Sequence, residues 1–75
     1  MRMELAACEA TILGEIADPV FKRADVATTY ALCLRSSERG AIDWKAVNAA
    51  IVERWSPAAL TWIRERAWKI AEGKA

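Results

Sequence analysis

Histidine is absent from the 75-residue sequence, and with it the side chain that proteins use most often as a general base and as a metal ligand. The two cysteines, Cys8 and Cys33, are too few for a zinc site built on thiolates. The sequence also has no glycine-rich phosphate-binding loop and no nucleophile paired with a histidine base. We therefore expect a protein that is not an enzyme and has no catalytic residues, metal, cofactor or small-molecule substrate.

Long apolar runs are missing as well. No stretch approaches the roughly 18 apolar residues of a membrane-spanning helix, so we expect no membrane partner. Cys8 and Cys33 lie far apart in the sequence, which favours buried free thiols in a cytoplasmic protein. A disulfide stays an alternative, because an antiparallel hairpin of the first two helices would bring the two positions opposite each other.

Glycine and proline are scarce, with three and two residues, and Pro19, Gly40 and Pro57 mark breaks between helices. The breaks fall at Asp18-Pro19, at the polar cluster 36–40 and at Ser56-Pro57. They leave one helical domain over residues 1–75, with helices predicted at about 3–17, 20–36, 43–55 and 57–72. The start of the second helix is open: Asp18 could cap it with Pro19 in its first turn, or Asp25 could begin it later.

Apolar residues recur at helical spacing in each of these segments, and no segment alternates with the period of a strand. The third segment has the clearest stripe, and Asn48 at its edge needs a hydrogen-bond partner if it is buried. The second segment is apolar on more than one side, which is typical of a helix packed between neighbours. We therefore predict an all-α fold, a compact bundle of four short helices. The stripes are Leu5, Cys8, Ile12 and Ile16; Trp44, Val47, Ile51 and Trp55; and Leu60, Ile63, Ala67 and Ile70.

The junction Trp55-Ser56-Pro57 joins the last two helices with almost no loop. Ser56 is a good N-cap and Pro57 a favoured first residue, so the fourth helix starts in a new direction. This architecture resembles a helix-turn-helix unit, in which the second helix enters the major groove of DNA. The resemblance implies that the second to fourth helices form a trihelical core and that the first helix packs across it.

The outward residues of the fourth helix are the candidate contacts to nucleic acid or to a partner. In the DNA-binding interpretation, Arg64 or Arg66 would read guanine and Lys69 would contact phosphate. Basic residues elsewhere would add contacts to the DNA backbone. The candidate site residues are Thr61, Trp62, Arg64, Arg66 and Lys69, with support from Lys22, Arg23, Arg35, Arg39 and Lys45.

A protein-interaction module is the alternative, and it uses Trp62. Trp44 and Trp55 belong to the core by their spacing, whereas Trp62 lies on the polar side of its helix. There it could cover the end of the first or second helix, or it could anchor a partner or a second copy of the chain. Residues 1–19 sum to a charge of −3 and residues 20–75 to +4, which is a thin basic excess for a DNA-binding protein. Glu65 would also oppose phosphate. Both functions stay open, and DNA is ranked slightly ahead because the junction has a defined mechanism.

Overall fold

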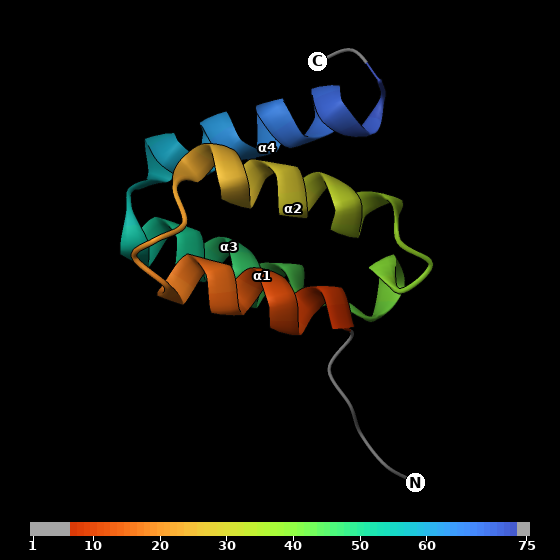
Figure 1. The fold of residues 1–75 in the computed structure, drawn as a ribbon, viewed down its shortest axis with the longest axis horizontal. Helices are drawn as coiled ribbons and strands as arrows, with labels where there is room; N and C mark the ends of the chain where they lie inside the picture. The colour runs from red at the N-terminus through yellow and green to blue at the C-terminus, as the bar shows by residue number, and fades with distance from the viewer. Residues whose placement is uncertain (1–6, 74–75) are drawn as a thin grey trace, which may run out of the picture.

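The computed structural model describes residues 7–73, which form four α-helices and one short 3₁₀ turn (Figure 1). The α-helices are α1 (Ala7–Ala17), α2 (Arg23–Arg35), α3 (Trp44–Arg54) and α4 (Pro57–Ala71), and the 3₁₀ turn η1 is Arg39–Ala41. No strand occurs in this part of the chain, so the predicted all-α bundle is confirmed. Residues 3–6 of the first predicted helix lie outside the described residues.

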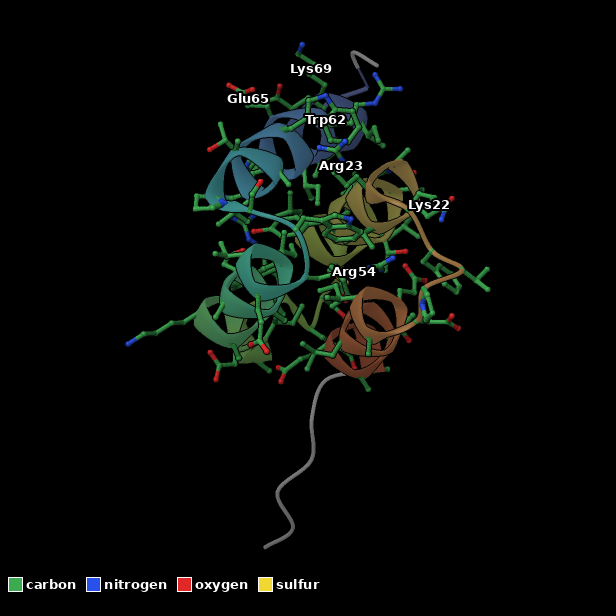
Figure 2. The ribbon with its side chains drawn as sticks, turned by 90° about the vertical axis from the view of Figure 1, so that its left-hand side faces the viewer. Lys22, Arg23, Arg54, Trp62, Glu65 and Lys69 are labelled. Carbon is green, nitrogen blue, oxygen red and sulfur yellow. The ribbon has the colours of Figure 1, made fainter. Side chains whose placement is uncertain are left out.

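The four helices run alternately up and down, and each is antiparallel to the next in the chain (Figure 1). Four pairs pack side by side, namely α1 with α2, α2 with α4, α4 with α3 and α3 with α1. Figure 2 looks along the bundle and shows α1 and α3 below α2 and α4. The backbones of α2 and α3 do not pack closely against each other, so α2, α3 and α4 do not form a three-helix core by themselves. The arrangement thus differs from the expected trihelical core, since α1 packs between α2 and α3 as the fourth helix of the bundle.

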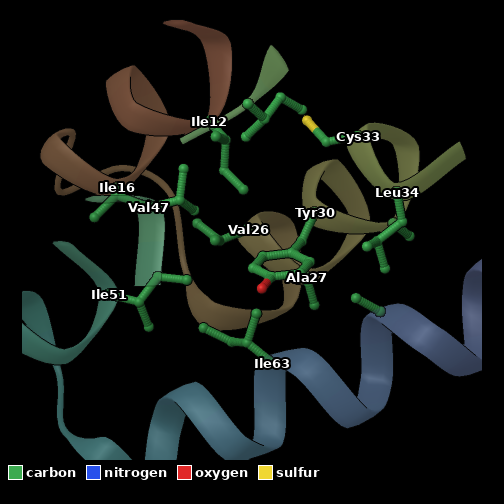
Figure 3. Close-up of a cluster of buried hydrophobic side chains, with 13 residues drawn as sticks. Ile12, Ile16, Val26, Ala27, Tyr30, Cys33, Leu34, Val47, Ile51 and Ile63 are labelled. Atoms are coloured by element: carbon green, nitrogen blue, oxygen red, sulfur yellow. The ribbon is translucent and has the colours of Figure 1, made fainter. Parts of the chain in front are cut away.

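The core fills the space between these walls (Figure 3). Ile12 on α1, Ile51 on α3 and Ile63 on α4 are each fully buried, as their apolar stripes predicted. Tyr30 of α2 reaches across the bundle to α3, where its hydroxyl donates a 2.7 Å hydrogen bond to Asn48 Oδ1. This bond supplies the partner that Asn48 was expected to need. The remaining core residues are Ile16, Val26, Ala27, Ala31, Cys33, Leu34, Ile42, Val47 and Ala67.

The turn between α1 and α2 settles where α2 begins. Pro19 and Val20 lie in this turn, and Asp18 Oδ1 accepts a 2.9 Å hydrogen bond from the Val20 amide. Asp25 sits in the first turn of α2, where its carboxylate accepts from the Lys22 amide at 2.8 Å. α2 therefore begins at Arg23, between the two starts that the sequence left open, because the Asp18 side chain stabilises a turn at residues 19–20.

Two long-range contacts fasten α1 to the rest of the bundle. The Arg54 guanidinium donates to the carbonyls of Glu15 and Ile16 at the end of α1, at 3.2 and 3.0 Å, and also to the Phe21 carbonyl. At the other end of α1, the buried Glu9 carboxylate accepts a 2.8 Å hydrogen bond from the Asp43 amide. Both ends of α1 are thereby tied to α3 or to the segment that leads into it.

Two further sequence expectations concern the cysteines and the membrane. Cys8 is half-buried, Cys33 is buried, and both are free thiols. Within residues 7–73, none of the helices combines the length and apolar character that crossing a membrane requires.

Candidate functional site

The fourth helix carries two of the four large apolar side chains that are exposed within residues 7–73. Its start matches the predicted junction: the Ser56 side chain accepts a 3.0 Å hydrogen bond from the Ala59 amide, and Pro57 opens the helix. Ala59, Ile63 and Ala67 face inward and are buried. Trp62 and Trp68 remain 45% and 38% exposed. Large exposed aromatic side chains are the informative exception on a surface, since Trp usually buries most of its area.

The candidate residues of α4 divide between its two sides. Trp62 faces the beginning of α2, where it lines a cleft of about 470 Å³ together with Lys22, Arg23 and Ala24 (Figure 2). Arg66 and Lys69 are exposed and follow Trp62 on the same side at helical spacing. We call Lys22, Arg23, Trp62, Arg66 and Lys69 the Trp62 flank.

Arg64 lies on the opposite side of α4, toward α3. It lines a second cleft, of about 200 Å³, between η1, α2, α3 and α4. A neighbouring hollow of about 300 Å³ shares Arg64 and Trp68 with it and is completed by Leu60, Thr61 and Glu65. The predicted site residues therefore do not form one face, because Arg64 and Thr61 border this second surface. We call the second cleft the Trp68 cleft; its lining residues are Tyr30, Leu34, Arg39, Trp44, Asn48, Arg64 and Trp68.

The Trp68 cleft is assembled by contacts between elements that are distant in the sequence. The Arg39 guanidinium carbon of η1 lies 5.5 Å from the centre of the Trp68 ring, a cation–π arrangement. The Trp44 indole donates a 3.1 Å hydrogen bond to the Arg39 carbonyl and packs on Tyr30 with ring centres 4.9 Å apart. Trp68 was not among the residues selected from the sequence. The sequence shows that Trp68 lies four residues after Arg64 and therefore on the same side of the helix, but it does not show that Arg39 packs on the Trp68 ring.

Charge is divided between the two halves of the bundle. Residues 22–35 and 57–72, which hold α2 and α4, contain six basic and three acidic side chains, a formal charge of +3. Residues 7–18 and 43–54, which hold α1 and α3, contain five acidic and two basic side chains, a formal charge of −3. Both the Trp62 flank and the Trp68 cleft border α4, so the exposed aromatic groups lie in the basic half.

One tyrosine and one cysteine next to these surfaces have altered acidities. Burial raises the pKa of Tyr30, although the Arg64 charge and the hydrogen bond to Asn48 act in the opposite direction. The pKa of Cys33 is raised chiefly by burial and then by its neighbour Cys8. In the part of the chain that the structure describes, no group of three His, Cys, Asp or Glu side chains is placed to hold a metal ion. The surfaces along α4 present indole rings and the positive charges of Lys and Arg side chains, and this chemistry suits apolar and anionic groups.

Comparison with known proteins gives no further guide to these surfaces. No protein family, no curated protein and no solved structure matches this chain.

Proposed function

We propose that this chain is a binding module that engages a partner protein through the outer surface of α4. The observation that carries the proposal is the exposure of Trp62 and Trp68 on a single helix, at 45% and 38%. A small domain gains stability by burying tryptophan, so leaving two exposed favours a use at the surface. Trp and Arg are also the residues most enriched at the energetic centres of protein interfaces.

The charge of this surface indicates the kind of partner. The half of the bundle that contains α2 and α4 has a formal charge of +3, and Arg23, Arg39 and Arg64 lie beside the two exposed tryptophans. Complementary charge raises association rates and suppresses wrong partners. The partner surface that fits best is therefore acidic, with apolar groups to contact the indole rings.

Selection of displayed peptides would test this function. A random peptide library is selected on the folded chain and counter-selected on the double variant Trp62→Ala/Trp68→Ala. We expect acidic-apolar peptides that bind the wild type and bind the double variant at least about tenfold more weakly. Peptides that bind both proteins equally, or no peptide enriched above the counter-selection, would refute the proposal.

Leu32 offers a matched control, because it is an apolar side chain 58% exposed on the outer side of α2. Leu32→Ala removes exposed apolar surface without touching α4, so it should leave peptide binding unchanged. Circular dichroism of all variants would confirm that each is folded. A loss of binding in Leu32→Ala would show that apolar surface in general, and not the surface of α4, attracts the peptides.

A second copy of the chain is one possible partner. Sedimentation of the wild type and of Trp62→Ala over a range of concentrations distinguishes this case. A wild-type dimer that the substitution dissociates would support a homodimer, whereas monomers in both would exclude it.

For the cell we propose a cytoplasmic location, which fits two free thiols, since reducing compartments keep cysteines in that form.

Duplex DNA is the second candidate ligand, favoured by the exposed Arg66 and Lys69 and by the +3 charge of their half of the bundle. Two features weigh against it: α3 and α4 run antiparallel side by side, and Glu65 is exposed on α4 between the basic residues. Fluorescence anisotropy with a random-sequence duplex at low ionic strength is the test. Binding that weakens steeply with salt, and further in Lys69→Gln, would support DNA, and an absence of binding would end this interpretation.

A further inference from the structure

The Trp68 cleft has the composition of an anion-recognition site. Its only charged lining residues are Arg39 and Arg64, and no carboxylate lines it. The aromatic groups around them, Trp44, Trp68 and Tyr30, lower the local polarity and strengthen attraction to a negative charge. An anion entering this cleft would therefore meet two guanidinium groups and no opposing charge.

Arg39 is held in place before any ligand arrives. Its guanidinium lies over the Trp68 ring at 5.5 Å, and its carbonyl accepts the 3.1 Å hydrogen bond from the Trp44 indole. Both the backbone and the charged end of this residue are thus anchored, although it belongs to a connecting segment. An arginine ordered in advance loses less conformational entropy when it binds.

Tyr30 and Asn48 form a polar pair in the lining of the cleft. The Tyr30 hydroxyl donates a 2.7 Å hydrogen bond to Asn48 Oδ1, so its hydrogen is already used and is not offered to a ligand. Burial raises the pKa of Tyr30 above the ordinary value of 10.0, so at neutral pH this residue adds no negative charge to the cleft. The charged groups offered to a ligand are therefore the guanidinium groups of Arg39 and Arg64.

The size of the cleft limits what can fill it. Its volume of about 200 Å³ is below the range of roughly 300–1,000 Å³ that is typical of small-molecule pockets. A single protruding side chain fits this space better than a complete small ligand. The adjoining hollow of about 300 Å³ contains Leu60 and also Glu65, so it favours an apolar neighbour over a second acidic one.

We propose that the Trp68 cleft receives an aspartate or glutamate side chain of the partner protein, held between Arg39 and Arg64, with an adjacent apolar residue in the neighbouring hollow. This inference rests on the proposed function and deepens it by naming the recognised group. Arginine binds carboxylates through two parallel charge-assisted hydrogen bonds, which gives both strength and orientation.

A pair of short probes tests the inference directly. Acetyl-Leu-Glu-amide and its neutral counterpart acetyl-Leu-Gln-amide are titrated to about 10 mM into the ¹⁵N-labelled full chain, because a single side chain binds weakly. We expect the acidic probe to shift the indole signals of Trp44 and Trp68 and the Nε signals of Arg39 and Arg64 in a saturable way. The neutral probe should bind about tenfold more weakly or not at all.

Substitutions then assign the effect to the cleft. Arg64→Gln and Arg39→Gln should each weaken binding of the acidic probe by about tenfold. Lys45→Gln is the matched control, because it removes one positive charge from an exposed position of α3 that lines neither the Trp68 cleft nor the Trp62 flank, and it should leave binding almost unchanged. Thermal melts verify folding, and Arg39→Gln keeps the test valid if the loss of Arg64, which lies beside Tyr30, destabilises the core.

Three results would overturn the inference: no shift with either probe, equal binding of the acidic and neutral probes, or shifts centred on Trp62 and Arg23. Its failure can be distinguished from failure of the proposed function. If the selected peptides need the two exposed tryptophans but are insensitive to Arg39→Gln and Arg64→Gln, α4 binds a partner without a carboxylate in this cleft. If no selected peptide depends on the tryptophans, the proposed function itself fails.

Discussion

Cys33 shows how strongly the interior of a small bundle changes the chemistry of one side chain. It is fully buried, and burial is the main cause that raises its thiol pKa above the ordinary value of 9.0. Its neighbour Cys8 and the negative charges of Glu15 and Glu38 act in the same direction. Because the thiolate is the reactive form, the protein keeps this cysteine unreactive at neutral pH.

The two cysteines should therefore differ in alkylation rate. In native buffer near pH 8, we expect iodoacetamide to modify the half-buried Cys8 at least about tenfold faster than the buried Cys33. Peptide mass spectrometry after timed quenching measures both rates, and the denatured chain serves as the control in which the rates converge. Equal rates in the native protein would contradict the burial of Cys33. An intact mass lower by two hydrogens before reduction would reveal a disulfide between them.

The pH dependence of stability follows from the same group. Above pH 9 the unfolded chain loses the Cys33 proton while the folded chain retains it, so the unfolded state is favoured. The free energy of unfolding should be unaffected by this thiol below that pH and should fall as pH rises above it. Urea denaturation at several pH values measures the slope. In Cys33→Ala, the decrease in the free energy of unfolding that begins near pH 9 should be smaller. The decrease at higher pH that comes from Tyr30 should remain, because the pKa of Tyr30 is also raised above 10.0.

At the scale of the helix, two N-caps determine where α3 and α4 begin. Asp43 accepts from the Ala46 amide at 3.1 Å, and Ser56 accepts from the Ala59 amide at 3.0 Å. Each of these bonds satisfies an amide that the helix itself cannot pair. Both caps are recognisable in the sequence because capping depends only on residues three positions apart.

Removing the cap of α4 should have a measurable cost. We expect Ser56→Ala to lower the free energy of unfolding by about 1 kcal/mol, because the Ala59 amide loses its partner. Ser37→Ala is the control, since Ser37 is exposed and outside the α-helices. Urea denaturation followed by circular dichroism compares the two variants. Equal stability of Ser56→Ala and the wild type would show that the tight junction is held by Pro57 and Trp55 alone.

Arg54 links elements in a way that a cap does not. Its guanidinium joins the carbonyls of Glu15, Ile16 and Phe21 and lies 4.1 Å from the centre of the Trp55 ring. The positive charge of Arg54 also lies at the C-terminal end of α1, where it interacts favourably with the negative end of the helix dipole. One side chain from α3 thus fixes the end of α1 and the turn that leads to α2.

Substitution of Arg54 should therefore destabilise the whole bundle. We expect Arg54→Ala to lower the free energy of unfolding by about 2 kcal/mol or more, since several carbonyls lose a charged donor. Arg54→Lys keeps the charge but loses the planar fork, and should recover less than half of the loss. Chemical denaturation measures both, with Lys45→Ala on the exposed part of α3 as a control. Full recovery by lysine would indicate that charge alone matters.

These contacts also show what could be predicted from the sequence. The helices, their caps and the buried stripes depend on spacings of three or four residues, so the pattern of residues around Ile51 or Ser56 was sufficient. The contacts of Arg54 with Ile16 and of Arg39 with Trp68 join residues far apart in the chain, and no local pattern encodes them. Helical spacing separates Trp62 from Arg64 around α4, but for the same reason the sequence could not show which helix borders each of them.

At the scale of the whole molecule, the dominant feature is the separation of charge. The half with α2 and α4 carries +3 and the half with α1 and α3 carries −3, while the net charge is only +1. The molecule measures 38 × 27 × 20 Å, so the two halves lie within roughly one 30 Å Debye length at 0.01 M ionic strength. The field around the protein is therefore dipolar, and the basic half of one molecule attracts the acidic half of another.

We expect this dipolar field to cause weak attraction between molecules that salt removes. Near pH 7.5 the second virial coefficient from static light scattering should be negative at about 0.01 M ionic strength and rise by about 0.15 M, where the Debye length is about 8 Å. Attraction that persists unchanged at the higher salt would point to the exposed tryptophans as its cause, because contacts between apolar groups are not screened.

Two lysine variants separate charge asymmetry from net charge. Lys69→Gln removes a positive charge from the basic half, and Lys45→Gln removes one from the acidic half, so each variant has a formal net charge of zero. Their asymmetries change in opposite directions, because the first reduces the difference between the halves and the second increases it. Relative to each other, Lys69→Gln should therefore show the weaker attraction at low salt and Lys45→Gln the stronger. If the two variants have the same virial coefficient, net charge governs the attraction and the division of charge across the bundle has no effect on how molecules approach α4.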